Sequence, residues 1–401
     1  MKAILVMTNQ ESYLYEELKS LCHACQIEVS NVLVQNIEKI NPATYIGKGK
    51  TEELKKMIDD EAVIFDNELT PLQVRNLSDI LQCRIMDRND LILQIFEKRA
   101  RTKEAKLQVE IAKNQYLLPR LAGMQEHLSH QQGGSGFRGR GEKQIELDRR
   151  IIARKLSKAK KELQAIVKQR QVQRQRRKNN DVFVIALVGY TNSGKSTLLN
   201  AFCQEKHKKV FQEDMLFATL ETATRKVKIK NHTCLLTDTV GFIDRLPHHL
   251  IQAFRSTLEE VKEADLLLHV VDGSNQDYSR QIETTNQVLK SLGVEHTPML
   301  YVYNKTDLGG HAFIHPESPY VFISAKKKIG LDLLEDEIAH LLFKQYEIFE
   351  LSIPYDQGEI YKQLCHDCQV IDTQYSDEYI YVKIEAKRRE ISQYYSYILK
   401  N

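Results

Sequence analysis

Four short segments in a fixed order constrain the fold of this 401-residue chain more than any other feature. They span residues 189–197, 238–241, 304–307 and 324–326, and the first has the spacing of a phosphate-binding loop. Apolar runs of strand type precede them. Ligands of open α/β sheets bind at the carboxyl ends of the parallel strands, so this order predicts a single ligand site on an α/β domain.

The residue types in these segments suit a guanine nucleotide with Mg²⁺. Backbone N–H groups of the first loop would converge on the phosphates, with Lys195 at the β and γ oxygens and the Ser196 hydroxyl on the metal ion. Asp238 would place a carboxylate near Mg²⁺, and the Gly241 N–H would meet the γ-phosphate, so that loss of this phosphate releases the loop. Asp307 can accept from the N1–H and the exocyclic amine of guanine, whereas adenine lacks this donor pair, and ATP should therefore bind poorly.

The four segments supply most of the predicted nucleotide-binding residues. These are Gly189, Tyr190, Thr191, Asn192, Ser193, Gly194, Lys195, Ser196, Thr197, Asp238, Thr239, Val240, Gly241, Asn304, Lys305, Asp307, Ser324, Ala325 and Lys326. The last three would lend backbone N–H groups to the oxygen of the base. A chance Gly/Ser turn can explain a lone phosphate-loop match, but four matching segments in order argue against it.

Length and cysteine usage set the outer bounds. The chain is too long for one ordinary core, so two or three domains are expected. No apolar run could span a bilayer, and residues 1–6 resemble a first strand more than a signal peptide, which predicts a cytosolic protein. Two cysteine pairs, Cys22/Cys25 and Cys365/Cys368, have the spacing of zinc ligands, but the helical spacing of their apolar neighbours favours small core residues with reduced thiols.

The net charge of +3 conceals a strongly basic segment. Residues 98–178 contain 23 Lys or Arg and seven Asp or Glu, a local balance of +16, so the rest of the chain carries −13. Apolar residues recur there at steps of four and three in two stripes, separated by a glycine-rich stretch at 131–141, which predicts an antiparallel helical hairpin with a basic tip. The stripes are Leu107, Ile111, Asn114, Leu118 and Leu121, then Ile152, Leu156, Ala159, Leu163 and Ile166.

This basic hairpin is a candidate RNA-binding element. Arg138 and Arg140 in the predicted tip could contact RNA phosphates, and Phe137 could stack on an unpaired base. The basic residues at 168–178 would act as linker and as phosphate contacts. A solvated coiled coil whose charges only maintain solubility is the alternative, although it leaves the positive excess unexplained.

Two smaller regions flank these parts. The first alternates short buried strands with amphipathic helices, which predicts a small parallel α/β domain. Its predicted strands lie at residues 1–7, 28–34, 62–65 and 83–86, and its predicted helices at 11–25, 51–59 and 71–81. The sequence Gly-Lys-Gly-Lys at 47–50 looks like a fragment of a phosphate-binding loop but lacks its spacing and hydroxyl. Near the other end, residues 379–384 predict a strand of a small α+β unit.

Several of these segments together resemble the HflX family of ribosome-associated GTPases. The matching runs are 189–197, 217–220, 238–242, 99–110 and 117–121, with further matches at 45–49 and 149–150, so the resemblance spans nearly the whole chain. It implies a Mg²⁺-dependent GTPase that binds the large ribosomal subunit and its rRNA, with the hairpin tip near the peptidyl transferase region. It also implies splitting or rescue of stalled or idle ribosomes under stress, and displacement of ribosome-targeting antibiotics as in some related resistance factors.

The resemblance adds site residues of its own. Phe217, Ala218, Thr219, Leu220 and Glu221 would close over the nucleotide, with Thr219 completing the Mg²⁺ shell beside Ser196 and Thr224 as the alternative if the register differs. The family usually has aspartate and proline where this chain has Glu221 and Thr222. The predicted RNA-binding residues are Phe137, Arg138, Arg140, Lys143, Arg149 and Arg150, of which Arg140 and Lys143 replace the usual proline and threonine of the family.

Hydrolysis is expected to depend on Lys195, Thr219 and Gly241. Phe242 stands where many regulatory GTPases have a glutamine that orients the attacking water, so intrinsic turnover should be slow and stimulated by ribosomes. Asn192 resembles the residue that holds K⁺ in some related GTPases, which makes potassium the second candidate ion.

The predicted protein is therefore an α/β chain with four parts. They are an N-terminal α/β domain at 1–96, a basic helical hairpin at 97–178, a P-loop GTPase domain at 181–345 and a small C-terminal α+β domain at 350–401. We expect a monomer. Two other functions fit the sequence less well: a GTP-dependent ribosome-assembly or RNA-binding factor, and an ATP-driven RNA remodeller that works through the N-terminal domain.

Overall fold

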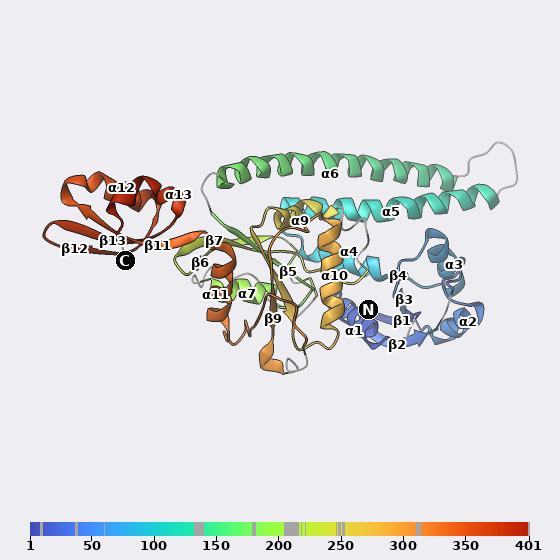
Figure 1. Ribbon diagram of the computed structural model, residues 1–401. Coiled ribbons are helices and arrows are strands. Elements are labelled where there is room, and N and C mark those ends of the chain that lie inside the picture. The colour runs from blue at the N-terminus through green and yellow to red at the C-terminus, as the bar shows by residue number, and fades with distance from the viewer. Residues whose placement is uncertain are drawn as a thin grey trace.

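The chain folds into an N-terminal α/β domain, a long helical hairpin, a nucleotide-binding α/β domain and a small C-terminal domain, as the computed structural model in Figure 1 shows. It describes residues 1–8, 11–36, 39–59, 61–131, 140–178, 182–203, 216–217, 219–220, 222–245, 247, 250, 253–309 and 314–399. Side chains are described for the same residues except 122–131, 140–145, 170–178, 255–258 and 367. The hairpin lies along one side of the first and third parts, and the C-terminal domain lies at the end away from the N-terminal domain (Figure 1).

The N-terminal domain is a parallel sheet of order β2-β1-β3-β4 with helices on both faces. Its elements are β1 (Lys2–Met7), α1 (Ser12–Ala24), β2 (Glu28–Val34), α2 (Lys48–Met57), β3 (Ala62–Phe65), α3 (Pro71–Leu81), β4 (Ile85–Asp87) and α4 (Arg88–Arg99). Successive side chains of a strand point to opposite faces, so Leu5 and Met7 pack with α1 and α4, whereas Ile4 and Val6 pack with α2 and α3. The predicted parallel α/β domain is confirmed.

Residues 47–50 differ from the prediction made for them. Helix α2 begins at Lys48 with Gly47 as its N-cap, so the predicted phosphate-like loop is the first turn of a helix. Thr51 and Leu54 lie one turn apart and are both buried, which holds the segment on the sheet as a helix.

The cysteines separate into buried and accessible thiols. Cys22 and Cys25 lie in the core of the N-terminal domain, and burial raises the pKa of Cys22 to about 12 and that of Cys25 to about 11. The predicted core position of Cys365 is wrong, because this residue follows the buried Leu364 on a helix and is turned to solvent. Among the residues that the structure describes, no group of three or more His, Cys, Asp or Glu could hold a metal ion.

The hairpin consists of α5 (Lys103–Gln131) and α6 (Arg140–Lys178), which pack against each other along their length. Leu107, Ile111 and Asn114 of the predicted stripe on α5 are buried, as is Ala159 on α6. The predicted ends need two corrections. Helix α6 begins at Arg140, so this residue belongs to a helix instead of the tip loop, and residues 168–178 continue that helix instead of forming a linker. The sequence after residue 141 lacks glycine and proline up to Lys178, which permits one long helix.

The third part contains a six-stranded sheet of order β10-β9-β8-β5-β7-β6, parallel except for the edge strand β6. Its elements are β5 (Val184–Val188), α7 (Lys195–Phe202), β6 (Ala223–Ile229), β7 (His232–Asp238), α9 (Arg255–Lys262), β8 (Leu266–Asp272), α10 (Tyr278–Ser291), β9 (Met299–Asn304), the 3₁₀ turn η2 (Thr306–Leu308), β10 (Tyr320–Phe322) and α11 (Leu331–Leu342). The four segments singled out in the sequence follow β5, β7, β9 and β10 at the carboxyl ends of these strands. The parallel arrangement therefore gathers them into one site.

The C-terminal domain is a small antiparallel sheet of order β11-β13-β12 with helices on one face. Its elements are β11 (Tyr346–Pro354), η4 (Tyr355–Gln357), α12 (Gly358–Asp367), β12 (Gln369–Tyr375), β13 (Tyr379–Lys387), α13 (Arg388–Ile391) and η5 (Ser392–Tyr397). The strand predicted at 379–384 extends to Lys387. No helix in the described part of the chain is long and apolar enough to cross a bilayer.

Candidate functional site

The phosphate-binding loop runs from the end of β5 to the start of α7, and its glycines are required by close contacts. Gly189 has φ +141°, and a Cβ there would lie 2.2 Å from the carbonyl oxygen of Val270. Gly194 has φ +97°, and a Cβ there would lie 2.2 Å from Nδ2 of Asn304. Only glycine fits both positions, so the backbone can turn tightly where its N–H groups face a phosphate.

Lys195 is buried inside the loop, with 6% of its surface exposed. Its ammonium group donates to the carbonyl oxygens of Gly189 at 3.0 Å and Tyr190 at 2.6 Å. Burial lowers the pKa of Lys195 to about 8, while the nearby Asp238 carboxylate opposes this shift. A buried cation held by two carbonyl oxygens is poised to pair with an incoming phosphate.

Three side-chain oxygens meet at the start of α7, where the metal ion was expected. Ser196 Oγ lies 2.6 Å from Thr219 Oγ1 and donates to Asp238 Oδ2 at 2.6 Å. The other carboxylate oxygen, Oδ1 of Asp238, is buried without a partner among the described residues, and burial raises the pKa of this carboxyl. Hydroxyl and carboxylate oxygens are the donors that Mg²⁺ prefers, so these residues fit the ion, and its charge would relieve the buried carboxylate.

Thr224, the alternative to Thr219, lies elsewhere. It belongs to strand β6, and its hydroxyl is 3.0 Å from that of Thr237 on β7. The structure thus brings Thr219, and not Thr224, to the hydroxyl of Ser196.

The loop after β7 is joined to the phosphate-binding loop through its backbone. Phe242 N–H donates to the carbonyl oxygen of Gly189 at 3.1 Å, and Phe242 O accepts from Thr191 N–H at 2.7 Å. A Cβ on Gly241 would lie 2.8 Å from Cα of Thr191 and 3.1 Å from Nζ of Lys195. The Phe242 side chain packs into the core beside Val188, so it faces away from the phosphate position.

At the part of the site expected to bind the base, Asn304 links the phosphate-binding loop to the segment after β10. Its Nδ2 donates to the carbonyl oxygen of Ser193 at 3.0 Å, and its Oδ1 accepts from Ala325 N–H at 2.9 Å. Asp307 Oδ1 accepts from the Ser324 hydroxyl at 2.6 Å, and this hydrogen bond lowers the pKa of the Asp307 carboxyl. An ionised, exposed carboxylate suits the two donors of guanine.

Other predicted residues have different positions. The side chains of Phe217 and Leu220 are buried in a hydrophobic cluster shared with the N-terminal domain. Asn192 is exposed with φ +61°. Arg149 and Arg150 are exposed on α6. Outside the described residues lie Ala218, Glu221, Phe137 and Arg138, and outside the described side chains lie Arg140 and Lys143.

Two sets of residues at the site were missed in the sequence. Asp272, at the end of β8, pairs with Lys305 at 2.7 Å, and its position after an apolar strand and before a glycine was the available signal. Residues of the N-terminal domain contact Tyr190 and Asp244 beside the phosphate-binding loop, and no local pattern marks them.

The sheet order, the phosphate-binding loop and the asparagine-lysine-aspartate segment together define a P-loop GTPase. Three family profiles match consecutive parts of the chain. Their descriptions are GTP-binding GTPase N-terminal at residues 12–97, GTP-binding GTPase Middle Region at 99–177 and 50S ribosome-binding GTPase at 184–305. The chain belongs to the HflX family of GTPases, as the resemblance in the sequence implied.

Curated relatives match the chain over most of its length. A GTPase HflX of Caldanaerobacter subterraneus subsp. tengcongensis is 45% identical over 388 residues, which cover 95% of this chain and 89% of that protein. The GTPase HflX of Escherichia coli K12 is 35% identical over 378 residues, with 90% and 87% covered. Among solved structures, the complex of SsGBP with GDP aligns with 86% of this chain and 98% of its own at 25% identity and a TM-score of 0.47.

Proposed function

We propose that this GTPase binds the large ribosomal subunit through its basic hairpin and splits stalled or idle ribosomes under stress. The observation that carries the proposal is the joining of a guanine-nucleotide site to a long basic hairpin in one chain. Displacement of ribosome-bound antibiotics is part of the proposal, since a hairpin tip near the peptidyl transferase region would compete for the same space. We also propose that the protein acts in the cytoplasm as a monomer.

The charges of α6 support an RNA partner. Its described solvent-facing residues include eight exposed basic side chains, and RNA backbone phosphates are the complementary partner for such a surface. They are Arg149, Arg150, Arg154, Lys155, Lys158, Lys160, Lys161 and Lys168. Positive charge spread along a helix binds the backbone of folded RNA without reading its sequence, which suits a ribosomal surface.

The nucleotide would control this binding through the two loops that meet at the phosphates. Ser196, Thr219 and Asp238 would hold Mg²⁺, and Lys195 would neutralise the β- and γ-phosphates. The metal ion would supply charge stabilisation for phosphoryl transfer. Because Phe242 packs into the core, we propose that water is oriented by backbone groups or by the ribosome, with K⁺ held near Asn192 as a second ion.

Sucrose-gradient sedimentation of intact ribosomes tests the proposal. We expect a loss of the intact-ribosome peak with a non-hydrolysable GTP analogue and little change with GDP. A variant with Arg154, Lys155 and Lys158 changed to Gln should fail to split ribosomes, whereas the matched control with Lys362 and Arg388 changed to Gln, which lies on the exposed C-terminal domain, should act normally. An unchanged ribosome peak with the wild-type protein in every nucleotide condition would reject the proposal.

Sedimentation and an ATPase assay together separate the alternatives. Binding to precursor particles alone, without loss of the intact peak, would favour an assembly factor. ATPase activity that survives Lys195→Ala would favour a remodeller in the N-terminal domain.

A further inference from the structure

Helix α4 of the N-terminal domain touches both nucleotide loops of the GTPase domain. The ring of Phe96 packs edge-on against Phe217 at 4.7 Å and against Phe254 at 4.8 Å between centroids. All three rings are buried, and Phe217 lies two residues before Thr219. A displacement of the loop that carries Thr219 therefore repacks a buried aromatic contact with α4.

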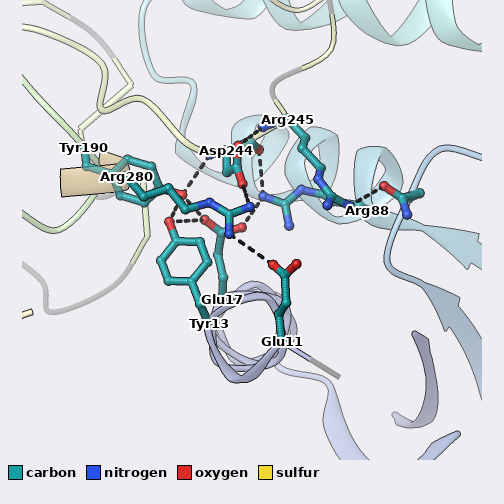
Figure 2. A network of polar contacts seen from close by, with 9 residues as sticks. Glu11, Tyr13, Glu17, Arg88, Tyr190, Asp244, Arg245 and Arg280 are labelled. Atoms are coloured by element: carbon teal, nitrogen blue, oxygen red, sulfur yellow. Dashed lines mark hydrogen bonds and ion pairs between the residues drawn. The ribbon is translucent and has the colours of Figure 1, made fainter. Parts of the chain in front are cut away.

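The start of the same helix holds the loop that follows Gly241 (Figure 2). Nη2 of Arg88 donates to the carbonyl oxygen of Asp244 at 2.9 Å and also pairs with the carboxylate of Glu17. The N–H of Asp244 donates to the hydroxyl of Tyr190 at 2.8 Å, and this hydroxyl also contacts Glu17. Arg88 and Glu17 are buried, so one contact network links the phosphate-binding loop, the second loop and the N-terminal domain.

Two further arginines tie the same loop to the N-terminal domain. Arg280 bridges Asp244 at 2.7 Å and Glu11 at 3.0 Å. Arg245 donates to Asn67 Oδ1 at 2.8 Å. The loop around Asp244 is thus linked to the N-terminal domain directly through Arg88 and Asn67 and indirectly through the Arg280–Glu11 ion pair (Figure 2).

The residue before Arg88 holds the hairpin. Asp87 is fully buried, and its carboxylate accepts from Arg120 Nη2 at 2.6 Å and from the hydroxyl of Tyr116 at 2.7 Å, both on α5. It also caps α4 by accepting from the N–H groups of Asn89 and Asp90. Adjacent residues at the start of α4 therefore contact opposite partners, the hairpin on one side and the nucleotide loop on the other.

We propose that α4 couples the nucleotide loops to the basic hairpin, with Arg88 and Phe96 as positioning residues for GTP hydrolysis and Asp87 as the anchor of the hairpin. The helix is short and packed on both sides, so a shift at Asp244 or Phe217 moves it as a unit and carries Asp87 with it. The inference rests on the proposed function only in assigning RNA to the hairpin. The coupling itself concerns the isolated protein.

Amide hydrogen exchange of the full chain with GDP and with a non-hydrolysable GTP analogue tests the coupling. In the wild-type protein we expect exchange rates at the start of α4 and in residues 108–121 of α5 to differ between the two nucleotides by at least about threefold. Equal rates in both regions would overturn the proposal.

Two variants test separately the link from α4 to the hairpin and the link from the nucleotide loops to α4. Tyr116→Phe/Arg120→Gln removes both side-chain links of Asp87 to the hairpin while Asp87 keeps its backbone donors, so we expect the nucleotide-dependent difference to persist in α4 and to vanish in α5, with wild-type GTP hydrolysis. The double variant Glu17→Gln/Arg88→Gln avoids leaving one buried charge unpaired. This variant should remove the nucleotide-dependent difference in exchange rate in both α4 and α5. It should also lower kcat for GTP hydrolysis at least about fivefold, with KM changed by less than about twofold.

A matched control changes another contact between the same two helices. Lys113→Ala removes the exposed ion pair of Lys113 on α5 with Glu97 on α4, at 2.8 Å, and should leave all measurements at wild-type values. A nucleotide-dependent difference in α5 that survives Tyr116→Phe/Arg120→Gln would overturn the proposal even if Glu17→Gln/Arg88→Gln does not fold. Since no ribosome is present, failure of this test is distinct from failure of ribosome splitting.

Discussion

The buried histidine of the GTPase sheet should make the stability of this domain depend on pH. His269 lies on β8 with 1% of its surface exposed, its ring is tilted against Tyr301 at 5.1 Å, and its Nδ1 has no partner among the described residues. Burial lowers the pKa of His269 from 6.5 to about 3. In the folded protein this imidazole is therefore neutral at all but strongly acidic pH, whereas in the unfolded chain it takes up a proton below pH 6.5.

The size of the effect follows from the two pKa values. Stability from a lowered pKa is fully present above the unfolded value of 6.5 and is lost as the pH falls toward 3. Each pH unit below 6.5 corresponds to about 1.4 kcal/mol, so His269 alone should remove about 2 kcal/mol of unfolding free energy between about pH 7.5 and pH 5.

His269→Phe keeps a planar ring of similar size and removes the titration. Native-state hydrogen exchange of the central strands β5 and β8, corrected for intrinsic rates, measures the opening free energy of this sheet alone. We expect the wild-type value to fall by about 2 kcal/mol more than that of His269→Phe between about pH 7.5 and pH 5. The comparison uses the change with pH in each protein, so any constant effect of the new ring cancels. Equal pH dependence in both proteins would refute the assignment.

Two further outcomes follow from the nucleotide site and a third from the burial of the cysteines. Asp307→Asn should weaken GTP binding by at least about a hundredfold and improve xanthosine triphosphate binding, because an amide can donate to the extra xanthine oxygen; a binding titration with both nucleotides decides this. Gly194→Ala should abolish GTP binding, since its Cβ would lie 2.2 Å from Asn304 Nδ2 at a φ of +97°, and retention of wild-type affinity would contradict the geometry. Alkylation at neutral pH, followed by mass spectrometry, should modify the exposed Cys365 and spare Cys22, whose pKa of about 12 keeps it a thiol; equal labelling of both would show the burial to be wrong.

Much of the fold could be predicted because its signals are local. Helix α3 coincides with the predicted span Pro71–Leu81, where a capping Thr70 and a proline mark the start. The boundaries of α2 and α6 were harder to predict, because the glycines at 49 and 141 suggested loops. In α2 the burial of neighbouring residues supports a helix, and in α6 a long run of helix-forming residues does so. The exposure of Cys365 was missed for a related reason, since helical spacing identifies a face only to within one residue.

The candidate site likewise contains residues that the sequence predicted and residues that it missed. The residues expected to bind phosphate, metal and base could be named because each group depends on residues a few positions apart at the end of one strand. Asp272 was missed because its local signal, an acidic residue between an apolar strand and a glycine, is weak until the sheet places it beside Lys305. The closure of residues 217–221 over the nucleotide stays a prediction, and the contact of the Phe217 ring with Phe96 is one that no local pattern indicated.

The sequence by itself determined which ligand this protein can hold, because the groups that bind phosphate and guanine are encoded in short segments after strands. It also determined the hairpin, because helical periodicity and charge are properties of neighbouring residues. Only the tertiary structure decided how the two are connected. Arg88 and Asp244 are 156 positions apart, and Glu17 and Tyr190 are 173 apart. Contacts at such separations arise from domain packing, so no local pattern predicts that one short helix touches both the nucleotide loops and the basic hairpin.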